Sequence, residues 1–266
     1  MVTRGTTPHN ALRWAMLRSV SLLIAYPSAR EGEWDAANGV ETLELGVGKT
    51  AAAATLAGRL VQGPPVGAVI LVGVCGAFPR AHLQNPTMAR EILELCVITS
   101  EVFGDEGVET PAGLLTVEDL GFGSSVPLSA CEHRSRKIAE RLGVHASVGL
   151  TVSTCSGTDL RSVERGRLGA AVESMEGASV AHVCGVHHVP WVQLRCVSSY
   201  TGNRTASTWR LDEALAKLGQ AAGRRTERAR DRSSARAEAM AGAAAAAAAS
   251  SGSCCSSSGS GSGGGS

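Results

Sequence analysis

The sequence predicts an α/β fold: a single three-layer α/β/α domain around a mixed, mostly parallel central sheet. Valine-rich runs typical of buried strands alternate along the chain with alanine-rich or amphipathic segments typical of helices. Two of these runs, at residues 67–74 and 189–194, lead directly into small and polar residues. Strands that end in this way bring side chains to the carboxyl edge of a sheet, where α/β enzymes place their sites.

The composition divides the 266 residues into a central domain, residues 19–218, and two flanking segments. Residues 1–18 contain arginine but no acidic residue, so they are expected to form a flexible leader, with a transit peptide as the alternative. Residues 219–266 are rich first in arginine, then in alanine, and finally in serine and glycine. Because this tail has no apolar period with which to offset the entropy of ordering, it is expected to be a flexible, low-complexity extension.

Charge and hydropathy argue against two classes of protein. The formal net charge is +1, so no nucleic-acid-binding domain is expected, and the arginines of the tail are either solvated or bind an acidic partner. The sequence contains no run that approaches ~18 consecutive apolar residues, so no membrane span is expected.

The eight cysteines are expected to be reduced. Most of them lie in or beside apolar or small-residue runs, as buried thiols do, and none forms a Cys-x-x-Cys pair that would indicate zinc. A reducing compartment fits this pattern. The expected location is therefore the cytoplasm, with an organelle as the alternative if the leader is removed.

In the first half of the domain, strands are expected at four runs rich in β-branched or large apolar residues: 19–25, 40–45, 67–74 and 93–102. The alanines of residues 50–61, with no helix breaker among them, predict a helix. Pro79 and the Asn-Pro pair at 85–86 predict a loop over residues 79–88.

In the second half, a charged amphipathic pattern predicts a helix at 131–142, followed by a valine-rich strand at 145–152. Small residues from Gly177 predict a second helix, and the run at 189–194 predicts the next strand. A closing helix is expected at 212–218.

The most specific pattern in the chain lies between Val172 and Trp209. Glu173-Ser-Met175-Glu176 precedes the expected helix at Gly177, and the next valine-rich run ends in Arg195-Cys-Val-Ser-Ser199. These residue types in this order resemble the nucleoside phosphorylase and nucleoside hydrolase superfamily, and within it the futalosine hydrolase branch. The resemblance implies that superfamily's α/β domain and its homo-oligomeric assembly.

Other segments resemble the superfamily in the same order along the chain. Residues 46–54 are similar to its early glycine turn, residues 69–78 to its second strand and glycine-rich exit, and residues 156–159 to its loop before the ribose helix. Residues 99–113 resemble a segment of the futalosine hydrolase branch. Several segments in the right order are more specific than any one motif.

The resemblance implies residues that bind a small-molecule nucleoside without a cofactor or a metal ion. Met175 and Glu176 would hold the ribose, because a carboxylate accepts hydrogen bonds from both ribose hydroxyls and lies near the charge of an oxocarbenium-like transition state. Gly48, Gly76 and Ser156 are also expected to contact the substrate.

Two further residues are expected to act on the attacking water. Glu31 lies in the turn after the first expected strand, where the superfamily has a glutamate that activates water. Glu33 is the alternative for this role, and a plain surface charge is the alternative reading of Glu31. Arg195 would orient the water or Glu31, with a structural salt bridge as its alternative.

Ser199, expected to assist catalysis, is the main departure from the superfamily pattern, which has Asn or Asp at this position. A serine hydroxyl donates one short-reaching hydrogen bond, so assistance to the leaving base, and the base preference, stay open. Glu173 is expected to be an exposed or capping charge. Trp209 is expected to pack in the core, with stacking on the substrate as the alternative.

The turn at Gly46–Thr50 does not predict an ATP or GTP site, although a strand, Gly-Lys-Thr and a helix succeed one another there. A phosphate loop requires a glycine where this chain has Leu43. A tight strand-to-helix turn explains the two glycines instead.

The reaction that the resemblance implies is hydrolysis of the N-glycosidic bond of a purine nucleoside. Futalosine is the indicated substrate, cleaved to hypoxanthine and dehypoxanthine futalosine on the route to menaquinone. One alternative is a phosphate-dependent nucleoside phosphorylase, in which Arg30, Arg80 or Arg90 would bind the phosphate. The other is a catalytically lapsed member that only binds a nucleoside.

Overall fold

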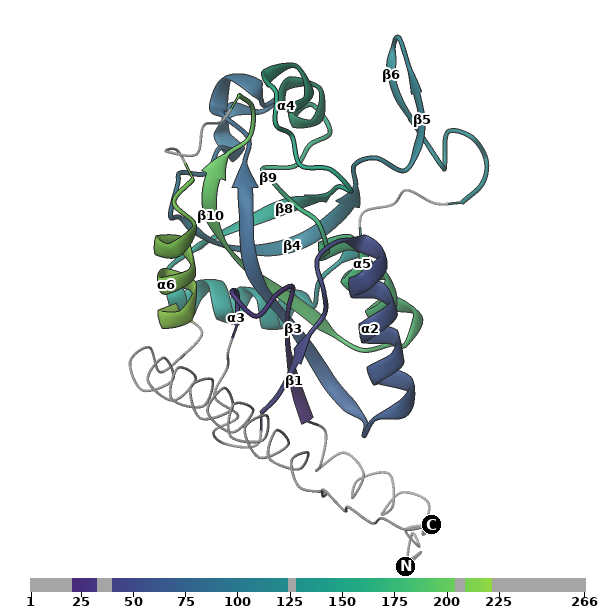
Figure 1. Ribbon diagram of the computed structural model, residues 1–266, viewed down its shortest axis with the longest axis vertical. Helices are drawn as coiled ribbons and strands as arrows, with labels where there is room; N and C mark the ends of the chain where they lie inside the picture. The colour runs from purple at the N-terminus through teal and green to yellow at the C-terminus, as the bar shows by residue number, and fades with distance from the viewer. Residues whose placement is uncertain (1–20, 33–39, 124–127, 204–208, 222–266) are drawn as a thin grey trace, which may run out of the picture. The chain divides into compact units, whose positions relative to one another are not determined.

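The computed structural model describes residues 21–32, 40–123, 128–203 and 209–221 (Figure 1). The expected leader at 1–18 lies outside the described residues. So does the expected tail from residue 222 onward, while its first residues, 219–221, belong to the last helix. The statements below concern the described residues.

One sheet of eight strands forms the centre of the fold. Its strands are β1 (Ser21–Tyr26), β2 (Glu41–Glu44), β3 (Val66–Ala77), β4 (Leu95–Phe103), β7 (Leu128–Ser129), β8 (His145–Thr151), β9 (Val172–Ser174) and β10 (Trp191–Tyr200). The pairings of β1 with β2 and β3, of β3 with β10, of β4 with β8 and of β8 with β9 are parallel. The pairings β4–β10, β3–β9 and β4–β7 are antiparallel. The mixed, mostly parallel sheet is therefore confirmed.

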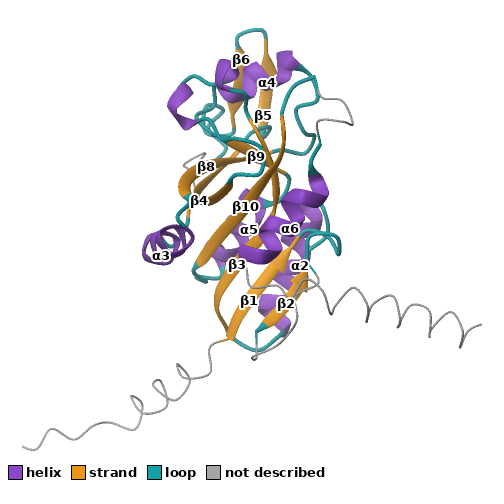
Figure 2. Cartoon of the chain, turned by 90° about the vertical axis from the view of Figure 1, so that its left-hand side faces the viewer, coloured by secondary structure: helices purple, strands orange, loops and turns teal. Residues whose placement is uncertain are grey.

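The pairings also close part of the sheet on itself. The strand order is β10-β4-β8-β9-β3-β1-β2, and β10 pairs with β3 as well as with β4. Strands β3, β9, β8, β4 and β10 thus form a closed ring, from which β1 and β2 extend as an open wing (Figure 2). The sequence predicted alternating strands and helices but not this closure, because pairing partners far apart in sequence leave no local signal.

Helices cover both faces of the sheet where β1 and β3 lie side by side. Val69 and Leu71 of β3 pack into the apolar cluster that contains residues of α2 (Lys49–Gln62) and α5 (Gly177–Val186). Their neighbours Ile70 and Val72 point to the other face, into the cluster that contains residues of α3 (Glu132–Leu142) and α6 (Leu211–Ala221). Figure 1 shows α2 and α5 on one side and α6 on the other, which confirms the three-layer prediction.

The remaining elements are two 3-10 turns, one short helix and a hairpin that is not part of the main sheet. Residues 79–88, expected as a loop, contain two 3-10 turns, η1 (Arg80–His82) and η2 (Pro86–Met88). The helix α4 (Asp159–Gly166) follows β8, and the two-stranded hairpin β5 (Gly107–Thr110) and β6 (Gly113–Thr116) forms a separate small sheet. No helix among the described residues is long and apolar enough to cross a membrane.

Candidate active site

The predicted site residues come together from four segments that are far apart in sequence. Glu31 follows β1, Gly48 lies between β2 and α2, and Glu176 lies between β9 and α5. Arg195 lies in the middle of β10, which runs parallel to β3, and both of these strands continue past the end of β1. The loops that follow β1 and β2 therefore come close to Arg195, as loops at the carboxyl ends of parallel strands do.

Arg195 is the buried centre of the site. Its side chain is fully buried beside Gly73 of β3, where any side chain would collide with the guanidinium. Nη1 donates to the carbonyl of Val74 (3.0 Å), and Nη2 donates to Ser174 Oγ and to Glu176 Oε2, each at 3.3 Å. Burial opposes the charge of the guanidinium, but the carboxylates around it outweigh burial and raise the pKa of Arg195.

Glu176 occupies the N-cap position of α5 and is 4% exposed. Its Oε1 accepts a hydrogen bond from the backbone N–H of Gly48 (3.1 Å), while its Oε2 faces Arg195. Gly48 has a φ of 96°, in the region that favours glycine, and this conformation aims its N–H at the carboxylate. The structure thus brings together two residues that the sequence predicted for one site.

Glu31, in the turn after β1, lies close to the same guanidinium: its Oε1 and Arg195 Nη1 both lie beside Gly73 of β3. Its Oε1 accepts from the N–H of Val74 and its Oε2 from the hydroxyl of Ser28, both at 3.0 Å. Burial raises the pKa of Glu31 above its ordinary value, although the nearby charge of Arg195 partly opposes this shift. A half-buried carboxylate with a raised pKa is a stronger base than an exposed one. Glu33, the alternative, lies outside the described residues.

The expectation for Glu173 was wrong. Its side chain is 3% exposed, and its two oxygens accept from the N–H and the hydroxyl of Ser156, each at 2.7 Å. Arg165 donates to Ser156 Oγ (3.1 Å) and lies 3.8 Å from Glu173 Oε2. Glu173 therefore anchors the loop after β8. Ser156, which is expected to line the substrate, donates both its N–H and its hydroxyl to this carboxylate.

The remaining predicted residues lie at the ends of the ring strands. Ser199 is 1% exposed and is paired in register with Gly76 of β3, just after an irregularity in β10. A Cβ on Gly76 would meet Thr201 Cγ2 at 3.2 Å, so this position is closely packed. Met175 is partly buried and directly precedes Glu176. These placements put Ser199 and Gly76 on paired strands and Met175 beside the carboxylate.

A family model described as the phosphorylase superfamily matches residues 35–231. The chain is 36% identical to a futalosine hydrolase of Streptomyces coelicolor over 194 residues, which cover 70% of this chain and 78% of that protein. It is 32% identical to a futalosine hydrolase of Thermus thermophilus, over 68% of this chain and 79% of the relative.

The chain belongs to the phosphorylase superfamily.

Solved structures agree on the fold of this superfamily member. A mutant of the futalosine hydrolase of Helicobacter pylori superposes with a TM-score of 0.62 at 17% identity, covering 77% of this chain and 97% of that one. A 5′-methylthioadenosine/S-adenosylhomocysteine nucleosidase of Colwellia psychrerythraea, in complex with adenine, superposes with a TM-score of 0.58 at 18% identity, covering 77% and 93%. At these identities the likeness concerns the fold alone.

The glycine turn of this superfamily member is not built around a phosphate. Lys49 points to acidic partners, with its Nζ 2.7 Å from Asp105 and 3.2 Å from Glu106, and it lies 5.5 Å from the ring centroid of Phe103. Gly48 directs its N–H to a carboxylate. Both observations agree with the sequence argument against an ATP or GTP site.

The arginines named for a phosphorylase each have another partner. Arg30 forms an exposed ion pair with Asp212 (3.1 Å), Arg80 donates to the carbonyl of Pro86 (2.9 Å), and Arg90 donates to Ser147 Oγ (2.7 Å). A phosphate bound by any of these arginines would compete with the contact it already makes.

Trp209 was expected in the core, but its side chain is half exposed, and its Nε1 donates to Ser198 Oγ (3.3 Å). The indole therefore covers the end of β10 from outside. Of the cysteines expected to be buried, Cys75, Cys96, Cys184 and Cys196 are buried, and Cys155 is partly exposed. The cysteines in the described part of the chain are all free thiols.

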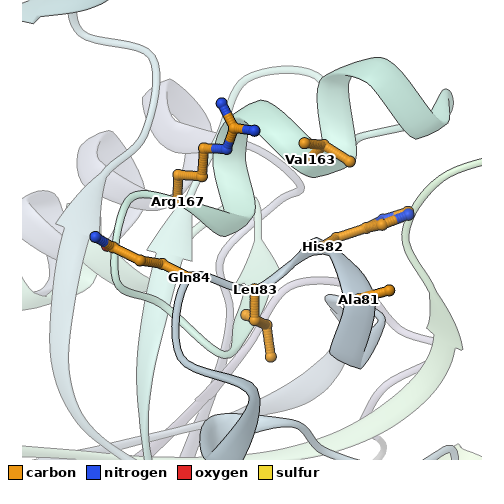
Figure 3. Close-up of a pocket in the computed structure, with 6 residues that line it drawn as sticks. All are labelled: Ala81, His82, Leu83, Gln84, Val163 and Arg167. Carbon is orange, nitrogen blue, oxygen red and sulfur yellow. The ribbon is translucent and has the colours of Figure 1, made fainter.

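A cavity of about 330 Å³ lies away from these residues, between η1 and α4 (Figure 3). It is lined by Ala81, His82, Leu83, Gln84, Val163 and Arg167. His82 Nδ1 is 2.8 Å from Ser162 Oγ, so this imidazole is already engaged. No group of three or more potential metal-ligating side chains occurs within the described residues.

Glu101, a fully buried carboxyl group in β4, was not predicted as a site residue. It lies near the end of the expected strand at 93–102, after Thr99 and Ser100. An acidic residue within an expected buried strand indicates a functional or structural site, because a buried carboxyl group needs hydrogen-bond or ion-pair partners.

Proposed function

We propose that this chain is a nucleosidase that hydrolyses the N-glycosidic bond of a purine nucleoside, with futalosine as its substrate. The supporting observation is that Glu176 pairs with the buried guanidinium of Arg195, while Glu31 and Arg195 both lie against Gly73 of β3. The identity to futalosine hydrolases over most of the chain supports the choice of substrate.

In this proposal Glu176 binds the ribose. Each of its oxygens accepts one hydrogen bond, from Gly48 or from Arg195, and retains a lone pair for a ribose hydroxyl. The carboxylate would also stabilise the positive charge that develops on the sugar as the bond to the base breaks. Arg195 holds this buried carboxylate in its orientation.

Glu31 acts as the general base. It takes a proton from a water molecule whose oxygen bonds to the anomeric carbon, while the electron pair of the glycosidic bond leaves with the base. The departing base takes up a proton from solvent, and Glu31 returns to solvent the proton that it took from water, so protons balance over the reaction. We assign the hydrogen bond to the departing base to Ser199. The closely packed lining at Gly76 belongs to the same end of the site.

The reaction is tested by base release from a panel of purine nucleosides, with and without phosphate. We expect equal rates in phosphate-free buffer, with free sugar as the product. A requirement for phosphate, with sugar 1-phosphate as the product, would establish the phosphorylase alternative. Nucleoside binding without any base release would establish the catalytically lapsed member.

Replacement of Glu176 by Gln is expected to lower turnover at least ~100-fold, which corresponds to ~2.7 kcal/mol of transition-state stabilisation. Gln preserves the volume but not the charge, so the domain should remain folded. Steady-state kinetics and thermal melting of the variant measure the two effects separately. The matched control is Glu140→Gln on the exposed face of α3, which should leave both unchanged. Near-wild-type turnover would remove Glu176 from ribose binding.

A homo-oligomeric assembly, a cytoplasmic location and a place in menaquinone synthesis stay predictions. Gel filtration of the purified protein tests the first of these.

A further inference from the structure

Glu101 of β4 is a second buried carboxyl group close to the site. Its side chain is 1% exposed. Oε2 accepts a hydrogen bond from the hydroxyl of Thr151 in β8 (2.9 Å), and Oε1 accepts one from the amide nitrogen of Gln193 in β10 (2.8 Å). The carboxyl group therefore joins three strands of the closed ring from the inside.

The same carboxyl group supports the start of α5. Thr151 Oγ1 accepts a hydrogen bond from the N–H of Ala178 (2.7 Å), in the first turn of that helix. The same hydroxyl donates its hydrogen bond to Glu101. Gly177 lies so close to Glu101 Oε1 that any side chain there would collide with it. Since Glu176 is the residue directly before Gly177, the position of Glu176 depends on this contact.

Gln193 extends the connection to Arg195. The two residues are two apart on β10 and so point to the same face of the strand. Gln193 is 1% exposed, and its Oε1 has no hydrogen-bond partner among the described residues. A Cβ on Gly177 would lie 3.0 Å from this oxygen, which places it near the carboxyl group of Glu101. A buried oxygen that lacks a hydrogen-bond donor is costly to leave unpaired. If Glu101 is protonated, its O–H is a donor close enough to pair with this oxygen of Gln193.

The charge of Glu101 changes near neutrality. Burial raises the pKa of Glu101 to about 7, against the lowering effects of Arg195 and of the hydrogen bonds from Thr151 and Gln193. The charged groups that act on it are Arg195 of β10 and Glu176 before α5. When Glu101 is protonated, its O–H can donate a hydrogen bond to Oε1 of Gln193. This requires the Gln193 amide to rotate by half a turn, which changes its shape little because the two ends of an amide are similar in size.

We propose that Glu101 is a positioning residue: through Thr151 and Gln193 it holds the first turn of α5 and strand β10 together, and so sets Glu176 against Arg195. This inference rests on the proposed function, since the role of Glu176 does. Ionisation of Glu101 adds a negative charge near the sugar site, which stabilises the cationic transition state.

The first test is Glu101→Gln, which keeps the shape of the side chain and mimics the protonated carboxyl group: its Oε1 accepts from Thr151, and its amide nitrogen donates to a rotated Gln193. We expect kcat of the variant to equal that of the wild type below about pH 6. The wild type should be faster by about fivefold above about pH 8, where it alone carries the extra charge. A constant ratio of the two rates across this range would overturn the role of the charge.

The second test separates positioning from packing. Thr151→Val removes the hydroxyl that links Glu101 to α5 and should raise KM about tenfold, whereas Thr151→Ser keeps the hydroxyl and should restore it. Nucleoside-dependent thermal shifts report the same binding without turnover. Loss of stability with unchanged KM in Thr151→Val would overturn the positioning role.

The wild type distinguishes a failure of this inference from a failure of the proposed function. If it releases base but the Glu101 and Thr151 variants match it at every pH, only the inference fails. If it neither cleaves nor binds any nucleoside, both are overturned.

Discussion

Glu31→Gln is expected to lower kcat by roughly 10²–10⁴-fold, the range that a positioned general base contributes. Gln retains the acceptor for the N–H of Val74 but cannot take a proton from water. Rates of base release from the same nucleoside measure the loss. Because burial raises the pKa of Glu31, an uncharged side chain there should leave Tm unchanged or higher at about pH 8.

The pH profile provides the control for Glu31. In the wild type, kcat/KM should fall as the pH drops through the raised pKa of Glu31, because the protonated form is not a base. This fall should be absent from the residual activity of Glu31→Gln. Wild-type turnover in the variant would contradict the assignment and direct attention to Glu33.

Arg195→Met is expected to lower the free energy of unfolding by about 3–5 kcal/mol, the cost of removing one partner of a buried ion pair. Arg195 is fully buried and faces Glu176, so its loss leaves that carboxylate buried without a cation. For a domain of this size the change corresponds to a fall in Tm of roughly 6–20 °C. Thermal melting measures it.

Two controls qualify the Arg195 result. Arg136→Met breaks an exposed pair with Glu140 and should change the free energy of unfolding by no more than ~0.5 kcal/mol. Addition of Glu176→Gln to Arg195→Met should recover part of the loss, because the unpaired charge is then gone. An unchanged Tm in Arg195→Met would show that the pair does not support the fold.

Several local elements around the candidate site were readable from the chain because their signals are local. Glu176 precedes a run of small residues that predicts a helix, and Arg195 follows a valine-rich run that predicts a buried strand, although this strand continues to Tyr200. The roles of the two residues came from the resemblance to the superfamily. Glycines at 46 and 48 indicate a turn with positive φ, which both adopt. Neighbouring residues alone determine such features, so order and spacing along the chain were enough to predict them.

The features that the sequence did not predict depend on partners far along the chain. Glu173 was expected at the surface, but it is buried because Ser156, 17 residues earlier, donates a hydrogen bond to it. Trp209 was expected in the core, but it lies half exposed and donates a hydrogen bond to Ser198 of β10. The pairing of β10 with both β3 and β4 also depends on segments far apart in sequence, so it could not be predicted from local patterns. The sequence by itself determined most of the elements, and its resemblance to the superfamily predicted the reaction and the residues that would carry it. The tertiary structure alone decided which charges are buried together, because burial and pairing are properties of the packed fold.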